Sequence, residues 1–374
     1  MNSNAAQFAL DPRLTYLNHA SYGAPSLAGL DHADLERRYL ERDTAPRLGG
    51  ELLDRLRTGA QAVAARLGAE PGSVALVANT TEGAAALASS VPLGAGDRVL
   101  MLDVEYSSVI RAWQVRCAAV GAHLDLVHLP LPATEESVLR LLRGADPRVR
   151  VAVISAITSS TALRLPLARV ADWARTAGVE LLVDGAHAMG HLELDVSAVP
   201  CGAVFGSLHK WLPVPRSVGF LWLAPHLRDL VRPAAISLYW DADDLVERFG
   251  WRGTWDPAPA LGLGRAWAEH QQWSESGHLL RAAALASEAG DVLGELGLVP
   301  TCDGALLAPR LRAFACPDLA LADLDAALLR DGVRAWTGLS AAGQTLLRVS
   351  THVYNDGDDL RALAHAVSIA RPAR

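Results

Sequence analysis

Short apolar runs alternate with amphipathic stretches between residues 50 and 225. The runs, each typical of a buried strand, read VALVAN (74–79), DRVLML (97–102), HLDLVHLPL (123–131), RVAVISAI (150–157), LLVDGAHA (181–188), AVFGS (203–207) and VGFLWLAP (218–225). Helical periodicity fills much of the sequence around them, as over 52–67 and 168–178. Strands that alternate with helical crossovers predict an α/β fold whose mostly parallel sheet is covered by helices on both faces.

The pattern changes after residue 257. A long helical pattern extends over Ala258–Leu296, and strand, helix, strand and helix follow it in a second, smaller unit. Residues 1–14 are interpreted as an N-terminal arm. We therefore expect the arm, a large α/β domain over 15–257, and a long linking helix with a small α+β domain over 258–374.

Composition narrows the class of protein. The 374 residues carry a net charge of −7 with scattered arginines, which argues against a nucleic-acid-binding surface. We find no uncharged apolar stretch long enough for a membrane span, and the N-terminus lacks the pattern of a secretory signal. The four cysteines show no paired spacing, so neither a metal site nor a disulfide framework is expected. These features favour a cytoplasmic protein.

The chain holds a single lysine, Lys210, among 34 basic residues. An amine can become neutral and form an imine, whereas a guanidinium stays protonated. The alternative is chance in an arginine-biased composition. Upstream, a buried apolar run delivers Asp184 at the carboxyl end of a predicted strand, where open α/β sheets place their ligands. This pair suits pyridoxal phosphate, because the lysine can hold its aldehyde while the acid keeps its ring nitrogen protonated.

Each of the other candidate site residues has two possible interpretations. Thr80 and Thr81 begin a predicted helix, where hydroxyls and free N–H groups either cradle a phosphate or only cap the helix. Tyr106 follows a strand and is either a stacking platform for a planar ligand or a half-buried tyrosine. Arg348 lies in an apolar strand and is expected to pair with an anion, either a substrate carboxylate or a structural partner.

Eight motifs in sequence order carry a family resemblance: YLNHASYG, NTTEG, DVEYSSVIRAW, TSSTALRLP, DGAHA, SLHKW, RGTWDPA and RVSTHVYND. Together they resemble the class V aminotransferase group of pyridoxal-phosphate enzymes, in particular its isopenicillin N epimerase-like and cysteine desulfurase-like members. The resemblance implies fold-type I, with a mostly parallel sheet of seven strands in the large domain and a small C-terminal α+β domain. It also implies a homodimer with shared active sites and an amino-acid-type substrate.

The resemblance assigns roles to individual residues. Lys210 would hold the cofactor as a Schiff base and move protons at the substrate Cα, with Asp184 and Tyr106 completing the catalytic set. The cofactor-binding set would be Thr80, Thr81, Tyr106, Asp184, His187, Ser207, His209, Lys210 and, contributed across the dimer, Thr254. The substrate would contact Arg348 through its α-carboxylate, together with Ser159 and Asn18. No metal is expected.

The sequence does not decide which reaction such an enzyme would catalyse. Desulfurases carry a reactive cysteine shortly before the carboxylate-binding arginine, but RAWTGLSAAGQTLLR, which ends at Arg348, contains none. We expect β-elimination of a specialised cysteine S-conjugate, a C–S lyase reaction, because it needs only one base. The alternatives are epimerisation, which usually needs a second acid on the opposite face, and transamination or a decarboxylation-linked reaction. A binding protein or partner subunit that has kept the fold is the non-enzyme alternative.

Overall fold

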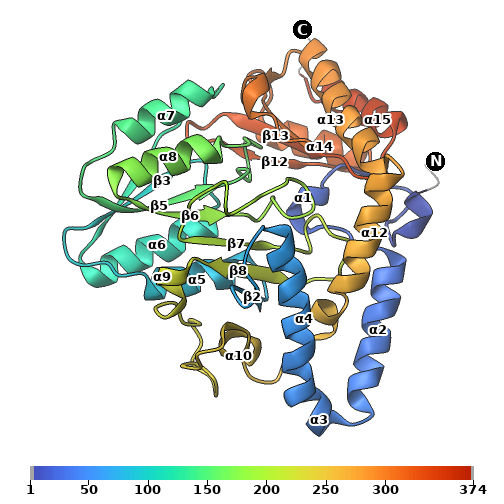
Figure 1. Ribbon diagram of the computed structural model, residues 1–374. Coiled ribbons are helices and arrows are strands. Elements are labelled where there is room, and N and C mark those ends of the chain that lie inside the picture. Colours follow the sequence, from blue (N-terminus) through green and yellow to red (C-terminus); the bar gives the residue numbers. More distant parts are fainter. Residues whose placement is uncertain (1–3, 372–374) are drawn as a thin grey trace.

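The computed structural model describes residues 4–371, and its core is one large sheet (Figure 1). The strands are β2 (Val74–Val77), β3 (Arg98–Leu102), β4 (His123–Val127), β5 (Val149–Ser155), β6 (Glu180–Asp184), β7 (Ala203–Ser207) and β8 (Gly219–Leu223). Their spatial order is β2-β8-β7-β6-β5-β3-β4, and only β8 runs antiparallel to its neighbours. The predicted mostly parallel sheet of seven strands is confirmed.

Helices cover both faces of this sheet because successive strand side chains point in opposite directions. In β3, Leu100 and Leu102 join one core and Val99 and Met101 join the other. The first core packs under α4 (Gly50–Arg66), α7 (Glu135–Arg143) and α8 (Leu167–Ala177), and the second under α5 (Thr80–Ser90) and α6 (Ser107–Val120). Figure 1 shows α7 and α8 on one side of the sheet and α5 and α6 on the other.

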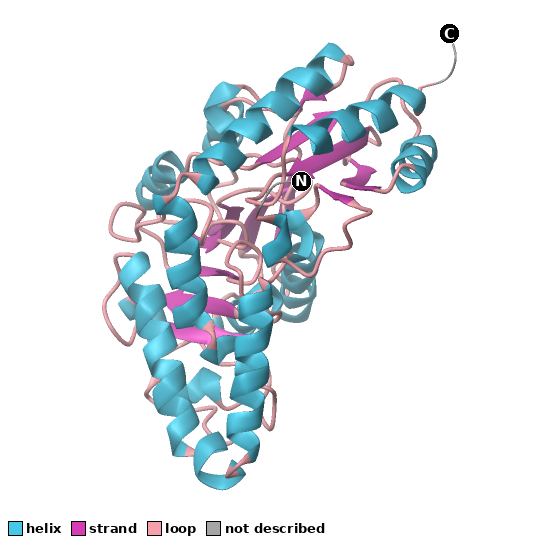
Figure 2. Ribbon diagram, turned by 90° about the vertical axis from the view of Figure 1, so that its right-hand side faces the viewer, coloured by secondary structure: helices cyan, strands magenta, loops and turns pink. Residues whose placement is uncertain are grey.

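A second sheet lies at one end of the molecule (Figure 2). Its order is β12-β13-β10-β9, formed by β9 (Val299–Pro300), β10 (Leu311–Ala315), β12 (Trp336–Leu339) and β13 (Thr345–Ser350). A separate apolar core joins it to α13 (His278–Glu295), α14 (Leu321–Arg330) and α15 (Gly357–Ile369). This unit is the small α+β part that the sequence predicts.

The N-terminal segment packs on this C-terminal unit. It contains a short 3₁₀ helix (Ala5–Gln7), and β1 (Thr15–Tyr16) pairs in parallel with β11 (Val333–Arg334). Phe8 is buried, with its ring centre 5.7 Å from that of Trp273. The chain then forms α1 (His19–Tyr22), α2 (Leu27–Glu41) and α3 (Thr44–Leu48) before it enters the large sheet. The start of the chain is thereby brought to the C-terminal sheet, which positions α1 for the site described below.

The long helical pattern predicted over 258–296 is wrong as a single helix. The structure has α11 (Ala258–Leu261), α12 (Leu263–Glu275) and α13 instead, after the short helices α9 (Pro225–Arg228) and α10 (Leu245–Gly250). Gly277 separates α12 from α13 with φ of 74°, a left-handed conformation that glycine adopts without a Cβ clash. Amphipathic periodicity continues across such a break, so the pattern alone did not reveal it. Within residues 4–371, none of the helices combines the length and apolar character needed to cross a membrane.

Candidate active site

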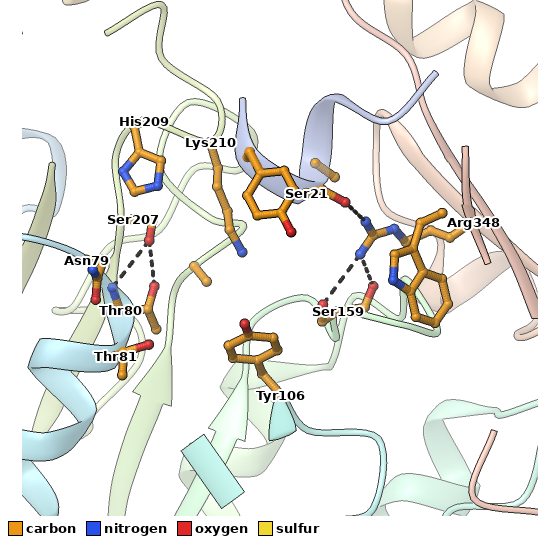
Figure 3. A pocket seen from close by; sticks show the side chains of 14 residues that line it. Ser21, Asn79, Thr80, Thr81, Tyr106, Ser159, Ser207, His209, Lys210 and Arg348 are labelled. Carbon is orange, nitrogen blue, oxygen red and sulfur yellow. Dashed lines mark hydrogen bonds between the residues drawn. The ribbon is translucent and has the colours of Figure 1, made fainter. Parts of the chain in front are cut away.

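A cavity of about 370 Å³ lies where the carboxyl ends of the large sheet's strands meet α1 and the C-terminal sheet (Figure 3). Eight residues predicted from the sequence line it: Thr80, Thr81, Tyr106, Ser159, Ser207, His209, Lys210 and Arg348. The lining does not include Asp184, His187 and Asn18, whose contacts are described below. Thr254 is exposed and does not line the cavity of its own chain.

Lys210 and Asp184 are placed by two neighbouring parallel strands. Asp184 is the last residue of β6, and Lys210 follows β7 by three residues, so both lie at the same edge of the sheet. Figure 3 shows the Lys210 side chain extending into the cavity. Burial lowers the pKa of Lys210 to about 8, although the charge of Asp184 opposes this effect. A substantial fraction of the amine is therefore neutral near physiological pH and able to act as a nucleophile or base.

Asp184 is a buried carboxylate without a close positive partner. It is 2% exposed, and its Oδ1 accepts the N–H of Ala186 at 2.8 Å. Among residues 4–371, no basic side chain forms an ion pair with it. Burial raises its pKa to about 6, against the N–H bond from Ala186 and the charge of Lys210, which lower it. Because a buried carboxylate needs compensation, this position suits a cationic N–H group supplied by a ligand.

A second carboxyl group, which the sequence analysis did not select, lies close to Asp184. Glu105 is buried, and both of its oxygens accept the N–H of Ser155, the residue that pairs with Asp184 across β5 and β6. Burial raises the pKa of Glu105 to about 8. The charge of Asp184 adds to this increase, so the two buried carboxyl groups disfavour being ionised together.

The start of α5 provides an anion-binding cradle. Asn79 is the N-cap, because its side chain accepts the N–H of Glu82 at 3.1 Å. Thr80 and Thr81 therefore lie in the first turn of α5, as expected, and capping does not occupy their hydroxyls. The Oγ1 of Thr80 lies 2.8 Å from the Oγ of Ser207. Hydroxyls at the positive end of an eleven-residue helix suit a phosphate group.

Tyr106 and His187 border the space around the Lys210 amine. Tyr106 precedes α6, is 40% exposed, and has its ring centre 5.8 Å from Lys210 Nζ. His187 lies on the buried side, with its Nε2 3.4 Å from the same Nζ. Burial and the charge of Lys210 lower the pKa of His187 well below its usual value, so its ring is neutral. A planar ligand held at Lys210 would have an aromatic ring and a neutral imidazole beside it.

Arg348 enters the cavity from β13 and is 2% exposed. Its guanidinium donates to the backbone oxygen of Ser159 at 2.6 Å, to Ser21 Oγ at 2.7 Å and to Asn18 Oδ1 at 3.3 Å. Within the described part of the chain it forms no ion pair with a carboxylate, so the structural pairing considered above is not found there. Burial lowers its pKa to about 10, which leaves it charged. Because only neutral oxygens accept hydrogen bonds from this buried guanidinium, its position favours the binding of an anion.

Asn18 therefore contacts Arg348, not the cavity itself. Two of the lining residues that the sequence analysis did not select, Ser21 and Trp336, also touch this arginine. Ser21 lies one helical turn after Asn18 and donates to it at 2.6 Å, a spacing that could have suggested the pair. The Trp336 ring centre lies 5.2 Å from the guanidinium carbon, because Trp336 pairs with Arg348 across β12 and β13. No sequence signal indicated that register.

Among residues 4–371, neither a thiol nor a cluster of metal-ligating side chains is found at this cavity. None of the four cysteines lines the cavity, and burial raises the pKa of each thiol. Over residues 4–371 there is no cluster of three His, Cys, Asp or Glu side chains arranged to hold a metal ion. The titratable groups available to a ligand are those already described.

Comparison with known proteins identifies a family and a fold for this chain. Residues 40–363 match the family model described as aminotransferase class V. The chain is 32% identical to isopenicillin N epimerase of Amycolatopsis lactamdurans over 96% of each chain, and 34% identical to a cysteine desulfurase of Klebsiella pneumoniae over 43% of this chain and 40% of that one. It also resembles the solved complex of the cystine C–S lyase C-DES with its product cysteine persulfide, with a TM-score of 0.83 at 22% identity over 96% of this chain and 99% of that one. This likeness confirms the expected fold.

Proposed function

The chain belongs to the aminotransferase class V family, and from this premise we propose that it is a pyridoxal-phosphate-dependent C–S lyase acting on a cysteine S-conjugate. The observation that carries the proposal is that one cavity without a thiol holds both a basic amine, Lys210, and a guanidinium, Arg348, that forms no ion pair with a carboxylate of residues 4–371. β-Elimination needs a base and a carboxylate anchor, and it needs no second nucleophile.

Pyridoxal phosphate is the cofactor of this family, and the residues present fit it. The uncompensated carboxylate of Asp184 suits a protonated ring nitrogen, and Lys210 is the amine that can bond the aldehyde. Thr80, Ser207 and the start of α5 suit the phosphate. When bound, the cofactor accepts the electron pair that is left on Cα after a bond to Cα breaks.

Capture of the cofactor should depend on pH. Burial lowers the pKa of Lys210 from 10.5 to about 8, and only the neutral amine attacks an aldehyde. The rate at which apoprotein takes up pyridoxal phosphate should therefore rise with pH and level off above about pH 8. Stopped-flow absorbance across this range measures it. A rate that still rises tenfold per pH unit between 9 and 10 contradicts the buried setting of this amine.

In the proposed elimination each chain group has one task. Arg348 holds the substrate α-carboxylate, which fixes the Cα–H bond relative to Lys210. The Lys210 amine takes the Cα proton, the Cβ–S bond breaks, and the sulfur leaves with its bonding electrons as a thiolate that is then protonated. The three-carbon enamine acid that remains is hydrolysed to pyruvate and ammonia.

The positions of the cysteines favour a lyase over a desulfurase with a persulfide relay. Such a relay needs a reactive thiolate that reaches the substrate sulfur. Cys316, the nearest cysteine before Arg348 in the sequence, is buried away from the cavity, and burial raises the pKa of its thiol to about 11. The sulfur product is therefore expected to leave as a free thiol.

Epimerisation is the second candidate, because the similarity to isopenicillin N epimerase covers nearly the whole chain. It requires a proton donor on the face of Cα opposite the base. Tyr106 is the group placed for that task, since its ring lies across the cavity from the Lys210 amine.

Proton NMR in D₂O separates these reactions. Protein loaded with pyridoxal phosphate is mixed with a set of cysteine S-conjugates and with ordinary amino acids. Pyruvate and a released thiol are expected from the conjugates. Deuterium at Cα together with loss of optical purity, and no pyruvate, would assign an epimerase instead.

The anchor role of Arg348 is tested by substitution. Arg348→Ala should raise KM for substrates with a free α-carboxylate by about 30- to 100-fold, because one charge-assisted bidentate contact is lost. The corresponding substrate amide should be affected little. Arg348→Lys keeps the positive charge but cannot form two parallel hydrogen bonds to a carboxylate. Its KM for the acid should lie between those of the wild type and Arg348→Ala. Equal losses on the acid and the amide would show that Arg348 does not hold the carboxylate.

We further infer a homodimer with shared active sites. Thr254 is exposed and lies outside the cavity of its own chain, as expected for a residue that serves another subunit. The face of α5 and α6 beside the cavity is also lined by small side chains, among them Thr81, Ser108 and Ala112. A second copy seated there would close the open side of the cavity.

A further inference from the structure

A packed group of aromatic rings lies directly behind Lys210. Its centre is Trp211, the next residue, whose side chain is fully buried. His191 stacks on the indole with ring centres 3.8 Å apart, and the Arg310 guanidinium carbon lies 4.8 Å from the ring centre. These contacts fix the plane of the indole. The indole N–H, which is the only polar group of the Trp211 side chain, therefore points in a fixed direction, toward His187.

The contact between Trp211 and His187 determines where the imidazole carries its proton. Trp211 Nε1 donates to His187 Nδ1 at 3.2 Å. An indole N–H can only donate, so Nδ1 must be the unprotonated nitrogen. The ring is buried and neutral, and its single proton therefore sits on Nε2. That N–H faces Lys210 Nζ at 3.4 Å.

The backbone of His187 is held by a second histidine whose tautomer is also defined. The backbone N–H of Arg310 donates to His191 Nε2 at 2.9 Å, so the proton of neutral His191 lies on Nδ1. This Nδ1 lies 3.2 Å from the backbone oxygen of His187 and donates to it. Groups outside the cavity thus fix both the ring and the main chain of His187.

We propose that Trp211 is a positioning residue that locks His187 in the tautomer with its proton on Nε2, so that the imidazole presents a hydrogen-bond donor to Lys210. A donor facing Nζ requires a lone pair on that nitrogen and so favours the neutral amine. The other tautomer would turn a lone pair toward Nζ and favour the ammonium. The same N–H is available to an acceptor oxygen of a cofactor held at Lys210. The inference rests on the proposed role of Lys210 but not on which reaction follows.

Other charged groups also act on the Lys210 amine and must stay unchanged in the test. Asp184 favours its charged form, whereas Arg348 and burial disfavour it. Tyr106 faces it from the open side. Substitution at Trp211 leaves all of these in place, so a change in Lys210 titration can be attributed to His187.

The experiment uses apoprotein labelled with [Nζ-¹⁵N]lysine, which gives one lysine signal because the chain has one lysine. Trp211→Phe keeps a buried aromatic ring and removes the N–H. It should raise the pKa of Lys210 by about one unit, the size expected when one hydrogen bond involving a charged group changes. The matched control is Trp113→Phe, because Trp113 is equally buried and its Nε1 has no partner in the structure. This control should leave the Lys210 titration unchanged.

A double substitution separates positioning from simple packing. In a His187→Leu background the side chain at position 187 has no hydrogen-bonding group, so adding Trp211→Phe should no longer shift the pKa of Lys210. Any of three results overturns the proposal: a shift in the pKa of Lys210 that persists in the double variant, no shift in Trp211→Phe alone, or an equal shift in Trp113→Phe.

A measurement on the wild-type protein covers the case in which Trp211→Phe does not fold. Histidine labelled with ¹⁵N, assigned by comparison with His187→Gln, should show His187 Nδ1 as an unprotonated nitrogen and Nε2 as a protonated one. The reverse assignment overturns the proposal. These readouts use neither cofactor nor substrate. If borohydride labelling fails to locate the cofactor on Lys210, the proposed function fails, while the tautomer result remains a separate finding.

Discussion

Lys210→Ala is expected to abolish covalent capture of pyridoxal phosphate and to lower turnover by on the order of 10⁴-fold or more, because nucleophile and proton-transfer group are lost together. Within the chain no other side-chain amine exists to substitute for it. Turnover is measured as pyruvate release, and capture as the absorbance of bound cofactor after gel filtration. Lys210→Arg is the matched variant, because it keeps the positive charge but cannot form an imine. It should be as inactive as the alanine variant.

Borohydride reduction gives the same prediction an independent readout. In the wild-type protein the added mass should lie on the peptide that contains Lys210, since the only other primary amine is the N-terminus. Both Lys210 variants should lose that labelled peptide. Wild-type turnover in either variant, or a label confined to the N-terminal peptide, would remove Lys210 from the mechanism.

Asp184→Asn is expected to lower kcat by about 10²- to 10³-fold while cofactor binding is retained, because a neutral amide no longer stabilises a positive ring nitrogen. The bound cofactor should lose the absorbance of its protonated ring. Asp184→Glu keeps the charge on a longer side chain and should recover part of the activity. Turnover of Asp184→Asn within twofold of wild type would contradict the electrostatic role.

The same substitution should stabilise the apoprotein. Burial raises the pKa of Asp184 from 3.8 to about 6, so the folded state binds the proton more tightly than the unfolded state does. Wild-type stability is therefore expected to fall as pH rises from about 4 to 6 and to stay lower above that range. Asp184→Asn should be more stable than wild type by on the order of 2 kcal/mol at pH 7, and the difference should vanish near pH 4. Urea unfolding of apoprotein at the two pH values measures this. Opposite effects on activity and stability are typical of a strained functional group.

The tautomer of His187 is a further feature of the site, beside the charged groups of Lys210 and Asp184. Lys210 and Asp184 both have pKa values shifted toward neutrality by burial, and neither has a close counter-ion in the described part of the chain. The Trp211 N–H decides which nitrogen of His187 carries the proton, so that the nitrogen facing the amine is a hydrogen-bond donor. The charged groups and the hydrogen-bond donor are thus in place without a ligand, and burial of these charges lowers the stability of the apoprotein.

The sequence by itself determined the elements and the chemistry of the large domain. Buried strands are continuous apolar runs, so six of the seven strands of the large sheet were visible as such, whereas β4 lies at the sheet edge and is only partly buried. Asp184 stood out as an acid at the end of one of the buried strands. Lys210 was visible because it is the only lysine. These signals are local: each depends on neighbouring residues or on composition, and neither changes when the chain folds.

Tertiary structure alone decided which distant residues meet. Arg348 reaches Ser159 and Ser21 across separations of 189 and 327 residues, and Trp336 reaches Arg348 through strand register. The amphipathic pattern ran through Gly277 although the helix breaks there, since a left-handed glycine changes chain direction without changing the apolar spacing. Side-chain partners across the fold depend on the packing of whole elements, and a sequence pattern with a period of two or 3.6 residues contains no information about that packing.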